Sequence, residues 1–174
     1  MNAQGAIVWD IQGQEYPHAT SYIGDPRELP PEMAPVIDEF FKKYTDAKLR
    51  VGVCIRPQLP VRKVYGSVVS QQQVDDQVKM MTDKITYASE RWQCSIFYVD
   101  SNVTYDSRYK ANDEAGYQLM SALDFKKLAE ACPDCLIMPE HENALYYAYS
   151  VPYNELKQDY FATPEDILRT YPKA

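Results

Sequence analysis

Acidic side chains follow several short apolar runs of this sequence, and carboxyl groups in such positions could carry out acid–base chemistry. The run "GAIVWD" ends on Asp10, "IFYVD" ends on Asp100, and "CLIMPEHEN" carries Glu140 and Glu142. Cleavage of a glycosidic bond needs two carboxyl groups: one donates a proton, and the other serves as nucleophile or as base for a water molecule. Asp100 follows the most apolar run and is the first candidate. Its partner is either Glu140 or Asp10, with Glu142 in reserve.

Other side chains near the same run ends suit a polyhydroxylated ligand. Aromatic rings stack on the apolar faces of sugars, and carboxylates accept hydrogen bonds from hydroxyl groups. Many of the 15 tyrosines follow these runs, and Arg56 ends the run "LRVGVCIR", where it could orient a carboxylate. The candidates for substrate binding are Trp9, Arg56, Asn102, Tyr147 and Tyr153. We therefore expect a carbohydrate ligand.

The apolar runs themselves predict the elements that position these residues. They are short and nearly continuous, which is typical of strands in a parallel sheet that is covered on both faces. We expect strands near residues 5–10, 50–56, 95–100 and 135–140. Helical patterns separate them at 30–47, 72–91, 121–133 and, more weakly, 163–172. The first has apolar positions at Met33, Val36, Ile37, Phe40 and Phe41, and the second has an apolar stripe at Val74, Val78, Met81, Ile85 and Ala88. The motif "SALD" predicts a capping box at the start of the third. Because no change of composition or flexible linker divides the chain, we expect a single α/β domain over residues 1–174.

The lengths of the connections favour one kind of parallel fold. Segments from strand to helix are long, whereas the returns "TDAKLR" and "EACPDC" are short. In parallel α/β folds, functional loops gather at the carboxyl ends of the strands. Four βα units amount to half of a TIM (β/α)8 barrel, so we favour half or a fragment of such a barrel over an open sheet. Half a barrel would expose sheet edges and an apolar interior, which predicts self-association or the remainder of a larger barrel as partner.

The motifs at the run ends also resemble a known family. "VWDIQGQ", "GVCIRPQ", "IFYVDSN" and "IMPEHEN" resemble successive strand ends in the catalytic barrel of retaining α-glycosidase-type glycoside hydrolases. The resemblance rests on four short motifs and is most specific at "VWD" and "YVDSN". It implies that Asp10 corresponds to the nucleophile and Asp100 to the acid/base residue. It also implies that strands preceding these four complete the barrel.

Composition argues against several other classes of function. The net charge of −7 disfavours nucleic acid and anionic membranes as partners. The sequence has no apolar run of about 18 residues and no layout typical of a secretory signal, so it indicates no compartment. No glycine-rich nucleotide-binding motif follows any predicted strand, and we therefore expect no such cofactor.

Three alternatives to a glycosidase remain open. The first is a non-catalytic carbohydrate-binding or structural α/β domain, which would present the same aromatic rings. The second is a metal-dependent hydrolase in which Glu140, His141 and Glu142 bind zinc or manganese. The third concerns the C-x-x-C pair Cys132 and Cys135, which is a weak indication of a redox or zinc site. Cys54 and Cys94 lie within apolar runs and are expected in the core.

Overall fold

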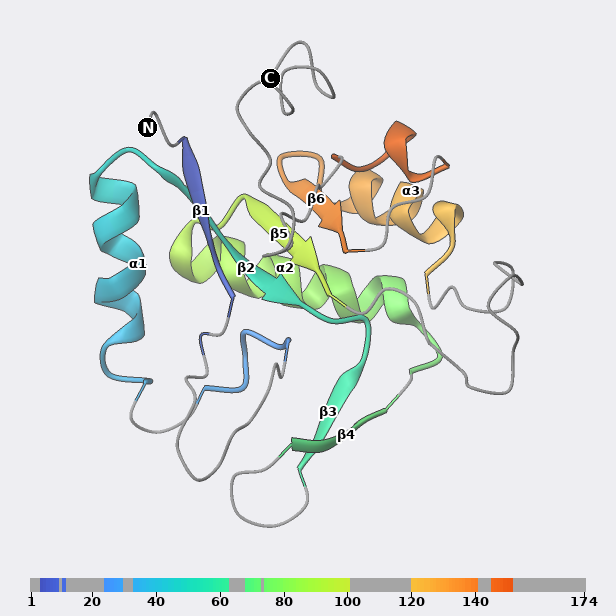
Figure 1. Ribbon diagram of the computed structural model, residues 1–174, viewed down its shortest axis with the longest axis horizontal. Coiled ribbons are helices and arrows are strands. Elements are labelled where there is room, and N and C mark those ends of the chain that lie inside the picture. The colour runs from blue at the N-terminus through green and yellow to red at the C-terminus, as the bar shows by residue number, and fades with distance from the viewer. Residues whose placement is uncertain are drawn as a thin grey trace, which may run out of the picture.

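The protein contains a four-stranded parallel sheet (Figure 1). The computed structural model describes residues 4–9, 11, 24–29, 33–62, 68–72, 74–100, 120–140 and 145–151. The strands are β1 (Gly5–Val8), β2 (Arg50–Ile55), β5 (Ile96–Val99) and β6 (Leu136–Pro139), and they lie side by side in the order β1-β2-β5-β6. All three strand pairs are parallel. The predicted strands and their parallel arrangement are confirmed.

Among the described residues, three α-helices alternate with these strands, and local signals in the sequence set their limits. They are α1 (Ile37–Asp46), α2 (Gln77–Trp92) and α3 (Ala122–Ala131). The Asp76 side chain accepts a hydrogen bond from the Lys79 N–H at the start of α2, and Ser121 and Asp124 form the predicted capping box of α3. Gln93, with φ 58°, ends α2 in the left-handed conformation. The helix predicted at 163–172 lies outside the described residues.

The strand order distinguishes between the two main parallel architectures. Doubly wound sheets reverse their strand order at a switch point, whereas neighbouring strands of a TIM barrel follow the chain. Here the strands follow the chain. Right-handed crossovers between consecutive strands place all the connecting helices on one face of the sheet. The described elements therefore have the architecture of part of a (β/α)8 barrel.

The hydrophobic core lies between the sheet and these helices. Alternate strand residues point into it, and they are Val51, Val53, Ile55, Phe97, Val99 and Ile137. From the helices they meet Ile37, Phe41, Met81, Ile85, Phe125 and Leu128. Cys54 and Cys94 are buried as predicted. Strands β2 and β5 approach closely at Gly52, where an added Cβ would lie 1.6 Å from the Ile96 carbonyl oxygen.

The prediction that both faces of the sheet are covered is correct for the central strands β2 and β5, in which every residue except Arg50 is buried. Every residue of β1 is only partly buried. On the face away from the core, the described residues leave a cavity of about 410 Å³. Its lining residues are Gly5, Ala6, Ile7, Trp9, Ile96, Tyr98 and Met138. The predicted apolar stripe of α1 is likewise too wide, because Val36 and Phe40 are exposed while Ile37 and Phe41 are buried.

A β-hairpin occupies the segment between β2 and α2, where we expected a loop. Strands β3 (Leu59–Arg62) and β4 (Val68–Gln72) pair antiparallel in a sheet of their own. The helix predicted from residue 72 therefore begins five residues later, at Gln77, because residues 68–72 pair with β3. A short 3-10 helix, η2 (Tyr146–Ala148), follows β6. Within the described ranges, no helix is long and apolar enough to cross a membrane.

Candidate functional site

Arg56, Asp100 and Glu140 directly follow the three strands β2, β5 and β6. The strand register pairs Ile55 with Val99 and Val99 with Pro139, so the next three residues lie in one row across the sheet. Main-chain hydrogen bonds from Asp100 N to Ile55 O and from Glu140 N to Val99 O, both 2.9 Å, continue the ladder to this row. Because side chains alternate along a strand, the row belongs to the face that carries Tyr98 and Met138. This face would line the interior of a barrel.

Asp100 and Arg56 form a buried ion pair at the centre of this row. The Asp100 Oδ2 atom accepts a hydrogen bond from Arg56 Nε at 2.5 Å and also lies 2.5 Å from a terminal guanidinium nitrogen. Their side chains are 7% and 15% exposed. Neither contact uses Oδ1, so the ion pair leaves this oxygen for another partner. The predicted role of Arg56 in orienting a carboxylate is consistent with this geometry.

An aromatic pair lies on the same face, below the ion pair. The ring centroids of Trp9 and Tyr98 are 4.5 Å apart and their planes are inclined by 41°. Tyr98 is buried, whereas Trp9 is 37% exposed. Both rings line the cavity described above. An exposed indole beside a buried phenol provides an apolar surface on which a sugar ring could stack.

The main chain of Arg56 is held by a glycine in the segment after β1. The N–H of Arg56 donates to the carbonyl oxygen of Gly24 at 2.9 Å. Gly24 has φ +61°, and a Cβ there would lie 2.5 Å from Arg56 Cγ. Only glycine satisfies both the backbone conformation and this close approach. The end of β2 is therefore fixed by the segment 24–29.

Asp25, which follows Gly24 in this segment, and Lys84 of α2 are two further buried charges. The Asp25 carboxylate is paired by Arg27, with Nε to Oδ1 at 2.8 Å and a terminal nitrogen to Oδ2 at 2.6 Å. Lys84 of α2 is completely buried, 3.7 Å from Asp25 Oδ2. Burial lowers the pKa of Lys84 to about 8, and the charge of Asp25 opposes this shift. Sequence reasoning missed all three residues.

One signal in the sequence could have identified Lys84. It lies three residues after Met81 and four before Ala88, on the stripe that was predicted to be apolar. A lysine on the buried side of a helix needs a partner for its charge. Asp25 and Arg27 had no such signal, because "GDPRE" has the composition of an ordinary turn.

Several predicted site residues lie outside the described residues. They are Asp10, Asn102, Glu142 and Tyr153, together with the side chain of Tyr147, whose backbone belongs to η2. Of the other candidates, Trp9, Arg56, Asp100 and Glu140 are brought to one face of the sheet. The neighbouring Tyr146 is a core residue: it is buried, donates a hydrogen bond to the Met120 carbonyl and packs on Phe125.

The described residues give little support to the alternatives that involve metal or thiol chemistry. His141 and Glu142 lie outside the described part of the chain, and within that part no three His, Cys, Asp or Glu side chains are grouped to hold a metal ion. Burial raises the pKa of the Cys132 thiol to about 11 and also raises the pKa of Cys135. A raised thiol pKa disfavours the reactive thiolate form.

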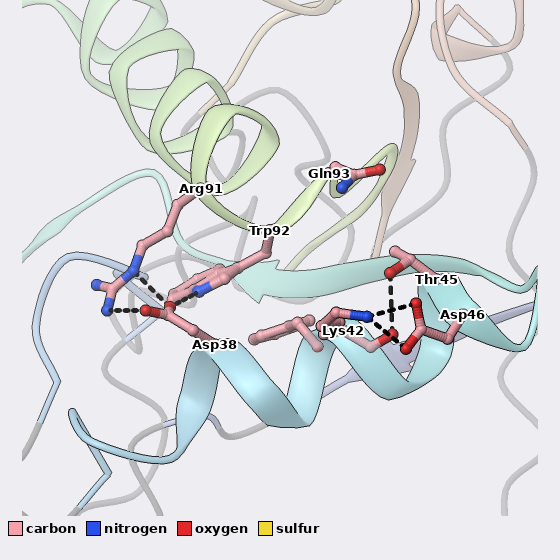
Figure 2. A pocket seen from close by; sticks show the side chains of 8 residues that line it. Asp38, Lys42, Thr45, Asp46, Arg91, Trp92 and Gln93 are labelled. Atoms are coloured by element: carbon pink, nitrogen blue, oxygen red, sulfur yellow. Dashed lines mark hydrogen bonds and ion pairs between the residues drawn. The ribbon is translucent and has the colours of Figure 1, made fainter.

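A different pocket, polar and of about 320 Å³, lies between α1 and the end of α2 (Figure 2). Asp38 accepts hydrogen bonds there from Arg91 and from the Trp92 indole N–H. Trp92 is buried and stacks on Phe41, with centroids 4.5 Å apart, so its ring is not offered to a ligand. Lys42 is paired with Asp46. These interactions join the two helices, and we do not assign this pocket as the site.

Comparisons with known proteins extend this description. No protein-family model and no curated protein matches the sequence. The structure is similar to a maltogenic alpha-amylase from Thermotoga neapolitana, with a TM-score of 0.54 and 12% identity, over 83% of this chain and 39% of the amylase. This similarity supports a glycoside-hydrolase-like α/β barrel fold. The chain spans well under half of the amylase's length.

Two further glycoside hydrolases are more distant. An alpha-L-fucosidase from Paenibacillus thiaminolyticus has a TM-score of 0.39 and 14% identity, over 78% of this chain and 34% of the fucosidase. A type I pullulanase from Bacillus subtilis has a TM-score of 0.37 and 14% identity, over 69% of this chain and 19% of the pullulanase.

Proposed function

We propose that this chain provides part of the active site of a glycoside hydrolase, and that Asp100 and Glu140 are its catalytic carboxyl groups. The observation that carries the proposal is the row of Arg56, Asp100 and Glu140 at the carboxyl ends of three adjacent parallel strands. Active sites of TIM barrels are built at this end of the strands. Asp10 and Glu142 follow β1 and β6 in the sequence and remain further candidates.

The ion pair favours a particular division of roles between the two carboxyl groups. A guanidinium group pairs best with a carboxylate, and a carboxylate serves as nucleophile or base, not as proton donor. Asp100 then attacks the anomeric carbon, while Glu140 protonates the glycosidic oxygen as its bond to that carbon breaks. Glu140 next takes a proton from water, which displaces Asp100 and releases the sugar. These roles differ from those implied by the family resemblance, in which Asp100 is the acid/base residue.

The spacing of the strands favours retention of configuration. Neighbouring strands lie about 4.8 Å apart, and two carboxyl groups about 5–5.5 Å apart are the arrangement of retaining enzymes, because no water molecule fits between them. The Trp9 ring would stack on the sugar. Arg56 would hold Asp100 in place throughout the reaction. The cavity beside them would face the inside of a barrel that further strands complete.

Hydrolysis of oligosaccharides by the assembled barrel, in which this chain is joined by the further strands proposed above, tests this proposal. Because the amylase with the similar fold is maltogenic, maltooligosaccharides are the first substrates, followed by a panel of nitrophenyl glycosides. We expect Glu140→Gln to lower kcat on oligosaccharides by about 10²-fold or more, the usual contribution of a general acid. Glu39→Gln, which alters an exposed carboxylate of α1, is the matched control and should leave the rate unchanged.

The stereochemistry of the product separates two forms of the proposal. Proton NMR of the first product should show the same anomeric configuration as the substrate if Asp100 is the nucleophile. An inverted product would mean that Asp100 or Glu140 activates water, and it would remove the proposed covalent step. Absence of hydrolysis with every sugar of the panel would contradict the assignment as a hydrolase.

A second candidate function is non-catalytic carbohydrate binding. The observation that favours it is the same ion pair, because an aspartate that is held by arginine could serve only to fix the site around a ligand. Isothermal titration calorimetry with the same oligosaccharides distinguishes the two functions. Binding without hydrolysis, weakened by Trp9→Ala but not by Glu140→Gln, would support binding over catalysis.

A further inference from the structure

The Lys84 side chain makes an unusual set of hydrogen bonds for a buried lysine. Its ammonium group donates to three main-chain carbonyl oxygens: those of Gly24 at 3.0 Å, Arg56 at 2.7 Å and Gln58 at 2.8 Å. An ammonium group has three N–H donors, so all three are used. A neutral amine has only two and would leave one buried carbonyl without its donor. The arrangement therefore matches the charged form of the side chain.

Two of these carbonyls belong to the main chain that directly follows β2. With the bond from Arg56 N to Gly24 O, both main-chain polar groups of Arg56 are fixed, one by Gly24 and one by Lys84. Lys84 also joins Gly24 to the same point. The helix α2, the segment 24–29 and the end of β2 thus converge on one ammonium group. Arg56 is the residue that binds Asp100 on the opposite face of the sheet.

We propose that Lys84 is a positioning residue, which holds the Arg56 main chain so that the guanidinium is aimed at Asp100. Its importance for catalysis rests on the function proposed above, but its effect on Arg56 does not. Lys84 itself touches neither Asp100 nor the cavity of the candidate site. Its influence therefore passes through the main chain at Gly24, Arg56 and Gln58.

The charges around Lys84 determine how its hold on the Arg56 main chain responds to pH. Asp25 and Arg27 face it from the segment 24–29, and Cys54 faces it from β2. Arg27 remains protonated throughout the accessible range, and burial raises the pKa of Cys54 far above its ordinary value. The Asp25 side chain is paired with Arg27. Among these groups, only Lys84, with a pKa of about 8, changes its charge in mildly alkaline solution.

The 15N chemical shift of Arg56 Nε is a direct probe, because this atom donates to Asp100 Oδ2. Carbon-detected NMR reads it without relying on the exchangeable proton. The Asp100→Asn variant defines the shift of a guanidinium without its carboxylate. We expect Lys84→Met to move the Arg56 resonance at least halfway toward that value. Lys79→Met, which removes an exposed lysine of the same helix, should leave the resonance in place.

A titration of the unaltered protein gives the same test without a substitution, in case Lys84→Met fails to fold. Between pH 6 and 9.5 the Arg56 resonance should move toward the Asp100→Asn value with a midpoint near the pKa of Lys84. An Arg56 resonance that stays fixed in Lys84→Met, or throughout this titration, would overturn the proposal. Because no carbohydrate is added, a failure of the proposed hydrolase activity would leave these results unchanged.

Discussion

Two groups of charged residues in this protein use the same chemistry in different surroundings. At the carboxyl ends of the strands, Arg56 pairs with Asp100, with side chains 15% and 7% exposed. Just before the amino end of β5, Arg91 pairs with Asp38, with side chains 30% and 62% exposed. Each arginine bonds its aspartate through Nε. The two groups differ in how exposed the paired side chains are to water and in what holds the arginine in place.

This difference indicates which group is built to act on a ligand. Exposed ion pairs contribute little to stability because water and salt screen them, whereas a buried charge is costly unless it is fully paired. Arg91 projects from the last turn of a helix, and its pair links two helices (Figure 2). Arg56 has both main-chain polar groups fixed beneath it. The buried Arg56–Asp100 pair, which is the more costly of the two to form, therefore lies at the carboxyl ends of the strands, where parallel α/β proteins place their functional sites.

The largest effect on stability should follow from removing Asp25. Asp25→Ala takes the carboxylate from both Arg27 and Lys84, and breaking a buried ion pair in this way costs about 3–5 kcal/mol of unfolding free energy. Urea denaturation measures the loss. Asp46→Ala removes the carboxylate of the exposed pair with Lys42 and should cost at most about 0.5 kcal/mol. Equal losses in the two variants would contradict the contrast between buried and exposed charges.

A smaller effect is expected at Gly24, which supports Arg56 from the other side. Gly24→Ala forces a side chain into the left-handed region and against Arg56, and we expect a loss of about 2–3 kcal/mol. Gly24→Asn tolerates the backbone conformation better but meets the same side chain. If Gly24→Asn is as stable as the unaltered protein, close approach to Arg56 is not what requires glycine there.

A still smaller effect than at Gly24 is expected at Asp38, in the exposed group, and it should depend on pH. Hydrogen bonds from Arg91 and Trp92 lower the pKa of Asp38 below its ordinary value. The Asp38 carboxylate therefore contributes stability above that ordinary value, and the contribution disappears as the pH falls through the folded pKa. Asp38→Asn should cost at most about 1 kcal/mol at pH 6, and less as the pH is lowered or salt is added. A cost that grows on acidification would contradict this assignment.

The sequence predicted the parts of the fold that depend on local pattern. Continuous apolar runs indicated the four strands, and "SALD" predicted the capping box that begins α3. The sequence analysis missed the hairpin of β3 and β4 because its two strands are short and no strong turn motif separates them. The recurrence of polar residues after the apolar runs also indicated that Arg56, Asp100 and Glu140 lie at one edge of the sheet. They do so because the register of parallel strands aligns the strand ends.

Contacts between distant segments lay beyond such reasoning. The importance of Gly24 depends on Arg56, which follows it by 32 residues, and Lys84 binds main-chain atoms that no residue type reveals. That Arg56 bonds Asp100 also depends on three-dimensional geometry. Spacing therefore predicted the row of polar side chains and a carboxylate for Arg56 to orient, but it predicted neither which carboxylate this is nor the residues that hold the pair in place.

A comparison of the two aspartates as catalysts tests the central claim most directly. Using the oligosaccharide that the unaltered protein hydrolyses fastest, kcat/KM is measured for Asp100→Asn and for Asp38→Asn, with folding of each variant confirmed by circular dichroism. We predict a fall of at least about 10²-fold for Asp100→Asn and a change of less than about twofold for Asp38→Asn. Similar values for Asp100→Asn and the unaltered protein would contradict the claim that Asp100 carries the chemistry.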